Sequence, residues 1–220
     1  MPRCRAGDIL EKLKSLSNPG NVEGMARFGI NPRNTLGVPI PVLRKIAKVT
    51  GKDHAVAQIL WSSGIHEARI LAGMVDDPSV VTPKQMDLWA GGFDSWDTCD
   101  QVCSNLFSYT AAAHKKTFEW SRRKEEYVKR AGFALMACLA VHDKKSKDAV
   151  FIRYFPVIKR ECKDGRNYVR KAVNWALRQI GKRNARLKKA ALKVAKEIYN
   201  IDSKAARWIA ADAIRELEKR

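Results

Sequence analysis

Trp96 and Asp100 are the residues whose types and spacing best suit chemistry in this sequence. They lie in segment 93–103, where Asp94 or Ser95 offers a side-chain oxygen that can cap the first turn of a helix. On a helix, a spacing of four places the indole and the carboxylate on one face. An aromatic surface beside an anion is a poor component for a core. It suits a flat, electron-poor and positively charged ligand.

Trp175 has a similarly polar neighbourhood at helical spacing. Lys171 precedes it by four residues, Asn174 is adjacent, and Arg178 follows by three. An indole with charged groups on its own helix face is expected to line a groove, although a tryptophan at the edge of a core has a similar pattern.

Trp61 and Trp208 lie in apolar runs and are expected to pack in the core. The neighbours of Trp89 and Trp120 do not decide their role, and packing is the more common one for such residues.

Asp100 also has an ordinary interpretation, because surface aspartates commonly form salt bridges with neighbouring lysines. Asp94 and Asp97 are explained as first-turn residues that complement the helix dipole. Arg130 precedes a strongly apolar stretch. Its planar cation suits a phosphate, but it could equally be a solvated helix residue.

The positive charge is concentrated in the second half of the chain. The net charge is +19, and residues 1–110 contain 12 Lys and Arg against 11 Asp and Glu, whereas residues 111–220 contain 30 against 12. A one-sided basic surface attracts polyanions, most commonly nucleic acid. The alternative, a charged surface of a heat-stable protein, usually balances its signs. The basic cluster at 182–196, with Lys182, Arg183 and Arg186 at its start, suits positioning on a nucleic-acid backbone.

Several function classes have no support in the sequence. It contains no Walker A, G-x-G-x-x-G, H-E-x-x-H or G-x-S-x-G motif. Cys99 and Cys103 lack further ligands at zinc-site spacing, so they are expected to be small core residues and no metal is expected. No apolar run is long enough to span a membrane, and residues 1–5 are not followed by a signal-peptide core. Five scattered cysteines are typical of reduced thiols and a cytoplasmic location.

The apolar periodicity predicts an all-α fold, and Val, Ile and Thr do not form alternating runs. Thr82 and Pro83 give one helix start, and Gly51 and Gly181 fall where helices should end. Helices are expected near residues 8–17, 21–28, 40–50, 53–62, 65–75, 83–90, 95–108, 111–121, 124–142, 147–162, 165–181, 184–200 and 203–218.

From residue 53 onward the expected helices form pairs of roughly 35–45 residues, the period of HEAT-like arrays. Stacked pairs share one core and present a curved, concave face. An irregular helical bundle is the alternative. Residues 1–52 are rich in loops and are expected to be an atypical N-terminal cap on a single domain that covers residues 1–220.

The sequence around His66 is compact and polar. An internal ion pair between Glu67 and Arg69 is the simplest explanation for it. His54, His114 and His142 have no convincing partners in the sequence.

Five stretches, in this order, resemble the AlkD-type DNA alkylation repair glycosylases. Together they span about residues 25–215, and the segment 95–100 resembles the W-D-x-x-D helix of that family. The resemblance implies a right-handed HEAT-like α-solenoid whose concave basic groove holds duplex DNA. The stretches are Arg44–Lys48, Leu60–Arg69, Ser95–Asp100, Lys129–Ala131 and Val169–Arg178.

The resemblance also implies an enzyme that excises positively charged N3- and N7-alkylated purines. Trp96 and Trp175 would contact the lesion, and Asp100 would be the catalytic carboxylate. Arg130 would bind a phosphate and Arg178 would be a weaker DNA contact. Lys171, Lys182, Arg183 and Arg186 add to the expected DNA-binding set. A monomer that acts on alkylated duplex DNA without a cofactor or metal is implied, with no membrane partner.

Two departures from the best-known family members bear on lesion range and catalytic strength. Ser95 stands where those members have the first of two tryptophans, and Phe28 is the only aromatic residue before Trp61. Two other classes therefore stay open. One is a non-catalytic HEAT-repeat scaffold that binds nucleic acid. The other is a solenoid that binds an acidic protein.

Overall fold

The computed structural model describes residues 6–219, and all regular structure within them is helical. Residues 1–5, on which the expectation about a signal peptide partly depends, lie outside the described range. Contacts divide the chain into two compact units, Met1–Thr110 (unit 1) and Ala111–Arg220 (unit 2). None of the described helices is long and apolar enough to cross a bilayer. The prediction of an all-α protein is confirmed.

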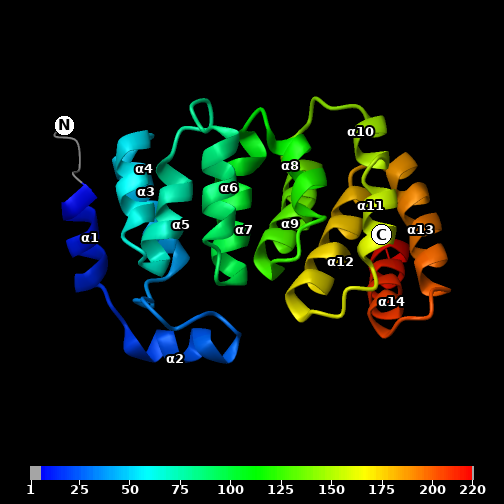
Figure 1. The fold of residues 1–220 in the computed structure, drawn as a ribbon, viewed down its shortest axis with the longest axis horizontal. Coiled ribbons are helices and arrows are strands. Elements are labelled where there is room, and N and C mark those ends of the chain that lie inside the picture. The colour runs from blue at the N-terminus through cyan, green and yellow to red at the C-terminus, as the bar shows by residue number, and fades with distance from the viewer. Residues whose placement is uncertain (1–5, 220) are drawn as a thin grey trace. The chain divides into compact units, whose positions relative to one another are not determined.

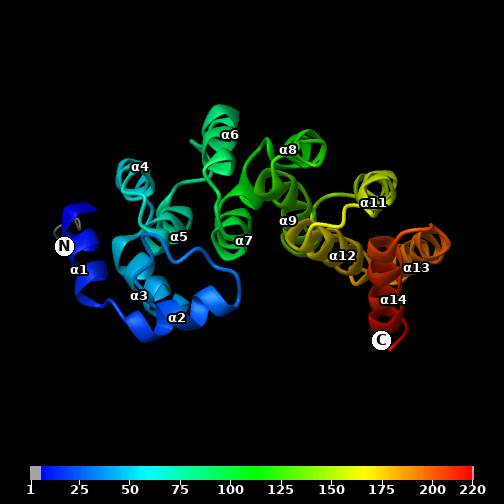
Figure 2. The same cartoon turned by 60° about the horizontal axis from the view of Figure 1, so that its bottom comes forward.

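In unit 1, helix α5 is central because it contacts α1, α3, α4 and α7. Figure 1 labels these helices, and Figure 2 shows α3, α5 and α7 as one layer, with α4 and α6 in a second layer. A short 3₁₀ helix, η1, follows α7. The bounds are α1 Ala6–Ser15, α2 Pro19–Arg27, α3 Ile40–Thr50, α4 His54–Ser62, α5 His66–Val75, α6 Pro83–Gly91, α7 Trp96–Asn105 and η1 Phe107–Tyr109.

In unit 2, helix α12 is central and packs against α9, α11, α13 and α14. Figure 2 shows α9, α12 and α14 in one layer, with α8 and α11 in a second layer. The bounds are α8 Ala113–Trp120, α9 Glu126–His142, α10 Asp148–Ile152, α11 Phe155–Glu161, α12 Asn167–Gly181, α13 Ala185–Tyr199 and α14 Lys204–Glu218.

The expected helix pairs are present, at a shorter period than predicted in the first part of the array. Successive pairs begin at residues 54, 83, 113, 148 and 185, which are 29, 30, 35 and 37 residues apart. The first two intervals are short because α4–α7 have only 9 or 10 residues each. Direct packing within pairs is extensive for α4 with α5, α8 with α9, and α13 with α14.

The prediction of a single helix at residues 147–162 was wrong, because the structure contains two helices there. The chain breaks at Arg153 and Tyr154, between α10 and α11. Pro156 lies in the first turn of α11. It lacks an N–H and disfavours the α conformation of the residue before it, so an uninterrupted helix is strained at this point.

Three of the four tryptophans outside the expected site are buried in the core. Trp61 stacks on the fully buried Trp89 with ring centroids 4.3 Å apart, and Trp120 is also buried. Trp208 was wrongly placed in the core, because 38% of it is exposed and the Arg170 guanidinium lies 4.5 Å from its ring centre. Its neighbour Ile209 takes the inward position, since successive residues on a helix point about 100° apart.

The core assignment of the cysteines is confirmed for the described residues. Cys99 and Cys103 are fully buried, and neither forms a disulfide bond.

Glu67 is the buried charge around which the N-terminal part of unit 1 is organised. Only 1% of it is exposed, and its carboxylate accepts the backbone N–H groups of Leu36, Gly37 and Val38 at 2.6–3.2 Å. The expected Glu67–Arg69 pair was wrong. Arg69 donates instead to the Gly92 carbonyl oxygen at 3.2 Å, and its guanidinium lies over the Trp61 ring.

Gly37 has no allowed replacement at this turn. Its φ is +76°, and a Cβ there would lie 2.3 Å from the Asn18 carbonyl oxygen. The absence of a side chain lets the chain turn tightly enough for three consecutive N–H groups to reach one carboxylate.

We expect Glu67→Ala to lower the free energy of unfolding by about 3 kcal/mol or more, because three backbone donors lose a buried charged acceptor. Urea denaturation of the purified variant measures this loss. Glu11→Ala, which removes an exposed carboxylate paired with Lys14, is the control and should cost about 0.5 kcal/mol or less. Equal losses in the two variants would contradict this role of Glu67.

Candidate functional site

Trp96 and Asp100 lie on α7, one helical turn apart, and both are half-buried. The Trp96 Nε1–H donates to the Phe28 carbonyl oxygen at 3.0 Å. This bond fixes the edge of the indole without burying its ring. The arrangement therefore keeps an oriented aromatic surface and a carboxylate close together on one helix.

Segment 28–38 is tied to the start of α7 by several hydrogen bonds. The Asn31 backbone N–H donates to Ser95 Oγ at 2.9 Å, and Asn31 Nδ2 donates to the Asp94 carboxylate at 3.0 Å. The expectation that Ser95 or Asp94 caps α7 through its side chain was wrong. Ser95 is the N-cap residue but makes no capping bond, because its hydroxyl is engaged by segment 28–38.

His66 contacts two polar residues in the first turn of α7. Its Nε2 lies 2.9 Å from an Asp97 carboxylate oxygen, and its Nδ1 lies 3.3 Å from Thr98 Oγ1. Burial opposes protonation of this ring. The hydrogen bond to Asp97 and the negative charges of Asp97, Glu67 and Asp94 outweigh it, so the pKa of His66 is raised. Asp97 thus does more than complement the helix dipole.

Phe28 is a neighbour of Trp96 that the sequence did not reveal. It follows α2 directly and is 75% exposed. The bond to Trp96 joins residues 68 positions apart, so no local pattern could have indicated it. The only sequence signal was negative: Phe28 is the sole aromatic residue before Trp61.

Four of the expected DNA-contacting residues lie on one face of α12. Lys171, Trp175, Arg178 and Lys182 follow one another at spacings of four, three and four, so they form a stripe along the helix. Lys171 is exposed, and the other three are half-buried. The buried residues of α12 point to the opposite side. We call these four residues the α12 stripe.

Carboxylates of α14 neutralise part of the α12 stripe. Glu216 forms ion pairs with both Arg178 and Lys182, and Asp212 lies 3.5 Å from Arg178. Asp212 also accepts a hydrogen bond from Asn174 Nδ2 at 2.6 Å. The sequence pattern did not reveal this arrangement, because the partners are 34 to 38 positions apart. A phosphate that approaches the stripe must compete with these acids.

Arg130 is a buried cation and not a solvated one. It is 5% exposed, and its Nη1 donates to the Tyr168 carbonyl oxygen at 2.6 Å, which links α9 to α12. The Tyr127 and Tyr168 rings stack nearby with centroids 5.7 Å apart. Its assignment as a phosphate contact stays a prediction.

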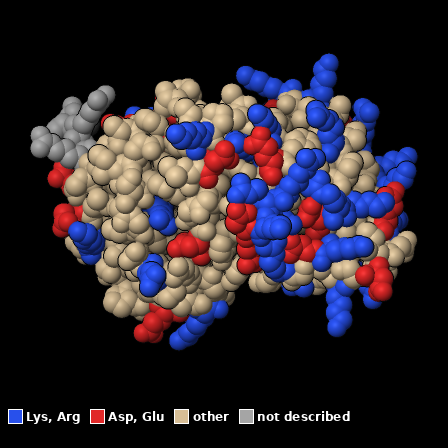
Figure 3. Space-filling model, in the orientation of Figure 1, with Lys and Arg blue, Asp and Glu red and all other residues tan. Residues whose placement is uncertain are grey.

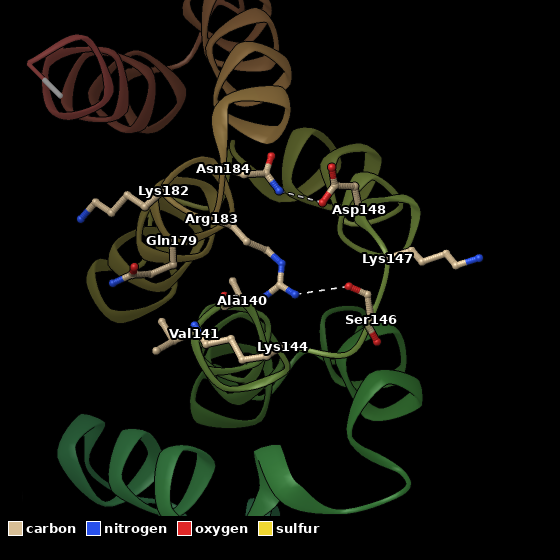
Figure 4. A pocket seen from close by; sticks show the side chains of 10 residues that line it. All are labelled: Ala140, Val141, Lys144, Ser146, Lys147, Asp148, Gln179, Lys182, Arg183 and Asn184. Carbon is tan, nitrogen blue, oxygen red and sulfur yellow. Dashed lines mark hydrogen bonds between the residues drawn. The ribbon is translucent and has the colours of Figure 1, made fainter.

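Arg183 and Arg186 are not part of the α12 stripe, although Arg183 and Lys182 line the same cavity. Arg183 donates to the carbonyl oxygens of Ala140 and Ser146 at 3.0 and 3.2 Å, and its guanidinium lies 4.2 Å from the Phe151 ring centre. Figure 4 shows this side chain crossing a cavity of about 450 Å³ between the ends of α9 and α12. Arg186 is exposed on α13.

Two histidines that lacked convincing partners in the sequence have them in the structure. His54 Nδ1 lies 2.7 Å from Asp76, and His114 contacts Tyr154 and Asp143 at 2.6 and 2.8 Å. These contacts join separate helices and loops within one unit. No cluster of potential metal ligands occurs among residues 6–219.

The charge imbalance coincides with the division into units. Unit 1 has 12 basic and 11 acidic residues, and unit 2 has 30 and 12. Figure 3 shows few charged side chains on the visible face of unit 1 and many lysines and arginines over unit 2, with acidic groups between some of them. The expected site residues form two groups accordingly: Trp96 and Asp100 in unit 1, and the α12 stripe and Arg130 in unit 2.

Comparison with known families identifies the chain. The family model described as "DNA alkylation repair enzyme" matches residues 9–217. The chain belongs to this family. Among curated proteins, none matches this DNA alkylation repair family member significantly.

A solved structure supports the fold assignment. It is described as belonging to "a new family of proteins related to the HEAT-like repeat DNA glycosylases with affinity for branched DNA structures". The match has a TM-score of 0.80 and 18% sequence identity, and it covers 97% of this chain and 95% of that chain. At this identity the likeness shows the fold, so the HEAT-like prediction for this DNA alkylation repair family member is confirmed.

We expect the stabilising contribution of His66 to depend on pH. A raised pKa means that the folded protein holds the proton more tightly, so the contribution is complete below about pH 6.5 and is lost as pH rises through the folded-state pKa. The difference in free energy of unfolding between wild type and His66→Gln should therefore shrink from about pH 5.5 to about pH 8.5.

Urea denaturation across this pH range tests the prediction. His142 provides a control of opposite sign, because burial and the charge of Lys144 lower its pKa. The corresponding difference for His142→Gln should grow with pH. A His66 difference that does not vary with pH would contradict the assignment.

We expect Glu216→Gln to strengthen binding of duplex DNA about three- to tenfold, because Arg178 and Lys182 lose a competing acid. The salt dependence should also steepen by about one to two units of slope, since each cation freed for a phosphate adds about 0.9. Fluorescence anisotropy at several salt concentrations measures both effects. Glu218→Gln makes the same charge change at an exposed position of α14 and should have a smaller effect on both. Equal effects would indicate net charge alone.

Proposed function

We propose that this protein is a DNA glycosylase that releases positively charged N3- and N7-alkylated purines from duplex DNA. The observation that carries the proposal is the pairing of Trp96 with Asp100 on one half-buried face of α7, in a chain of the DNA alkylation repair enzyme family. A carboxylate in that position repels phosphate and attracts a cationic group, so it favours a site for a positively charged base over simple binding of the backbone.

The chemistry of the lesion suits these residue types. An alkylated purine already carries a positive charge, so it leaves without protonation and needs no general acid. As the N-glycosidic bond breaks, positive charge develops on the sugar. In this proposal the Asp100 carboxylate stabilises that charge and orients the attacking water. The face of Trp96 attracts the cationic base and the electron-poor sugar hydrogens.

Two features of unit 1 support a fixed position for these groups. The bond from Trp96 Nε1 to the Phe28 carbonyl oxygen holds the indole, and the His66–Asp97 contact holds the first turn of α7. Preorganised charge stabilises a transition state more effectively than charge that must first be oriented. Phe28 itself offers an exposed aromatic ring next to this contact.

We expect Asp100→Asn to lower release of 7-methylguanine from methylated duplex DNA by about 100-fold or more, because the charge that stabilises the transition state is lost. Its Kd for the duplex should change less than about threefold. Chromatography of free base and anisotropy measure the two quantities. Asp87→Asn, at an exposed carboxylate of α6, makes the same charge change outside the contacts of α7 with segment 28–38; it is the matched control and should keep its activity. Release by Asp100→Asn at the wild-type rate would refute the assignment.

A non-catalytic nucleic-acid-binding scaffold is the second candidate. Ser95 favours it, because this residue is fully buried and accepts the Asn31 N–H, which leaves no room for the tryptophan of the best-known glycosylases. The structural neighbour described by its affinity for branched DNA also favours it. The same chromatographic assay separates the two candidates: a scaffold releases no base at any protein concentration, yet binds junction DNA with a steep salt dependence.

A further inference from the structure

The exposed face of α13 is a continuous row of cations. Arg186, Lys189, Lys193 and Lys196 follow one another at spacings of three, four and three, and all four are exposed. At about 1.5 Å per residue the row is ~15 Å long. We call these four residues the α13 ridge. Figure 3 shows lysine and arginine side chains at the end of unit 2 that α13 occupies in Figure 1.

The ridge differs from the α12 stripe in its charge balance. Within the described chain, none of its four cations has an acidic partner at ion-pair distance, whereas Arg178 and Lys182 of the stripe are paired with α14. Glu197, the acid nearest in sequence, pairs with Lys159 at 2.9 Å. The four cations of the ridge are therefore open to an external anion. Arg178 and Lys182 of the stripe are partly neutralised by acids of the protein.

The ridge and the stripe also lie on different faces. The buried residues of α13, among them Leu187, Ala191 and Ile198, pack toward α12 and α14, and the ridge is on the opposite side of the helix. The packing is close: a Cβ on Gly181 of α12 would lie only 3.0 Å from the Ala191 Cβ. The ridge thus faces away from the two helices that carry the stripe and its acidic partners.

The geometry of the ridge fits one strand of a nucleic-acid backbone. Phosphates follow one another closely along each strand of a B-form duplex, so a row of cations ~15 Å long meets more than one of them at a time. Flexible lysine cations contact phosphates and do not read bases. An acidic protein fits less well, because protein interfaces are anchored by clusters of buried aromatic or aliphatic side chains, whereas Leu192 is a single aliphatic residue in the hollow that three of the ridge lysines line.

We propose that the α13 ridge binds the phosphate backbone of a second duplex segment, separate from the segment that contacts the α12 stripe. The proposal rests on the proposed function for its choice of DNA as the polyanion. The protein would then hold two duplexes at once, either two linear molecules or two arms of one branched molecule.

Native mass spectrometry with a 12-base-pair duplex tests the ridge directly. Wild type should form complexes with one and with two duplexes. In the variant Lys189→Gln/Lys193→Gln/Lys196→Gln the Kd for the second duplex should rise at least tenfold, and its salt slope should fall by about 2.7 for three lost phosphate contacts. The control Lys124→Gln/Lys163→Gln/Lys219→Gln removes the same charge from exposed lysines elsewhere in unit 2 and should affect the second duplex much less.

A four-arm junction and its unbranched arms, used as competitors, distinguish the two sources of the second segment. Preferential displacement by the junction indicates two arms of one molecule. Equal displacement at equal phosphate concentration indicates two linear duplexes.

A wild type that binds one duplex or none would overturn the ridge proposal, as would a control that loses the second duplex as strongly as the ridge variant. Polyglutamate that binds the ridge and is not displaced by duplex would also overturn it. Base release is assayed separately. Two bound duplexes without released base would contradict the proposed glycosylase and leave the ridge intact.

Discussion

A buried carboxylate needs hydrogen-bond donors to replace the water it has lost, and this requirement at Glu67 determines the course of the chain in unit 1. Three consecutive N–H groups, from Leu36 to Val38, meet that need. The loop is thereby fixed to α5, and the residues before it reach the start of α7. Phe28 and Asn31 then bind Trp96 and Ser95. The orientation of the candidate lesion-binding indole thus depends on an acid 29 residues away from it.

In unit 2, the contacts that each cation makes within the protein determine how much positive charge is available to a ligand. A net charge of +18 over residues 111–220 suggests a uniformly basic surface. The structure instead has cations in different states. Arg130 is buried and Arg183 is half-buried, and both donate to carbonyl oxygens; Arg178 and Lys182 are paired with acids; and the cations along α13 are open. Affinity for a polyanion depends on the open cations and on the ease of breaking the pairs, more than on the total charge.

The groups suited to catalysis and the groups suited to binding the DNA backbone therefore lie in different units of the chain. A fixed indole and a carboxylate in unit 1 are suited to a cationic leaving group, and the basic helices of unit 2 are suited to the DNA backbone. A HEAT-like fold alone does not imply either activity, because one fold can hold different sites. In this chain the family membership and the α7 pair together support base excision. The serine at position 95 is the feature that most distinguishes its site from those of the best-known family members.

The sequence by itself determined the features that depend on local periodicity: the all-helical class, most helix positions, the common face of Trp96 and Asp100, and the alignment of Lys171, Trp175 and Arg178 on α12. Each follows from the fixed angle between successive residues of a helix. Tertiary structure alone decided which charges are paired and which polar side chains bind loops. Glu67 binds three distant backbone N–H groups and not Arg69. Ser95 accepts the Asn31 N–H and does not cap its own helix. Glu216 forms ion pairs with two cations of the α12 stripe. Those partners are 29 to 64 positions apart, and only the packing of whole helices brings them within hydrogen-bond distance.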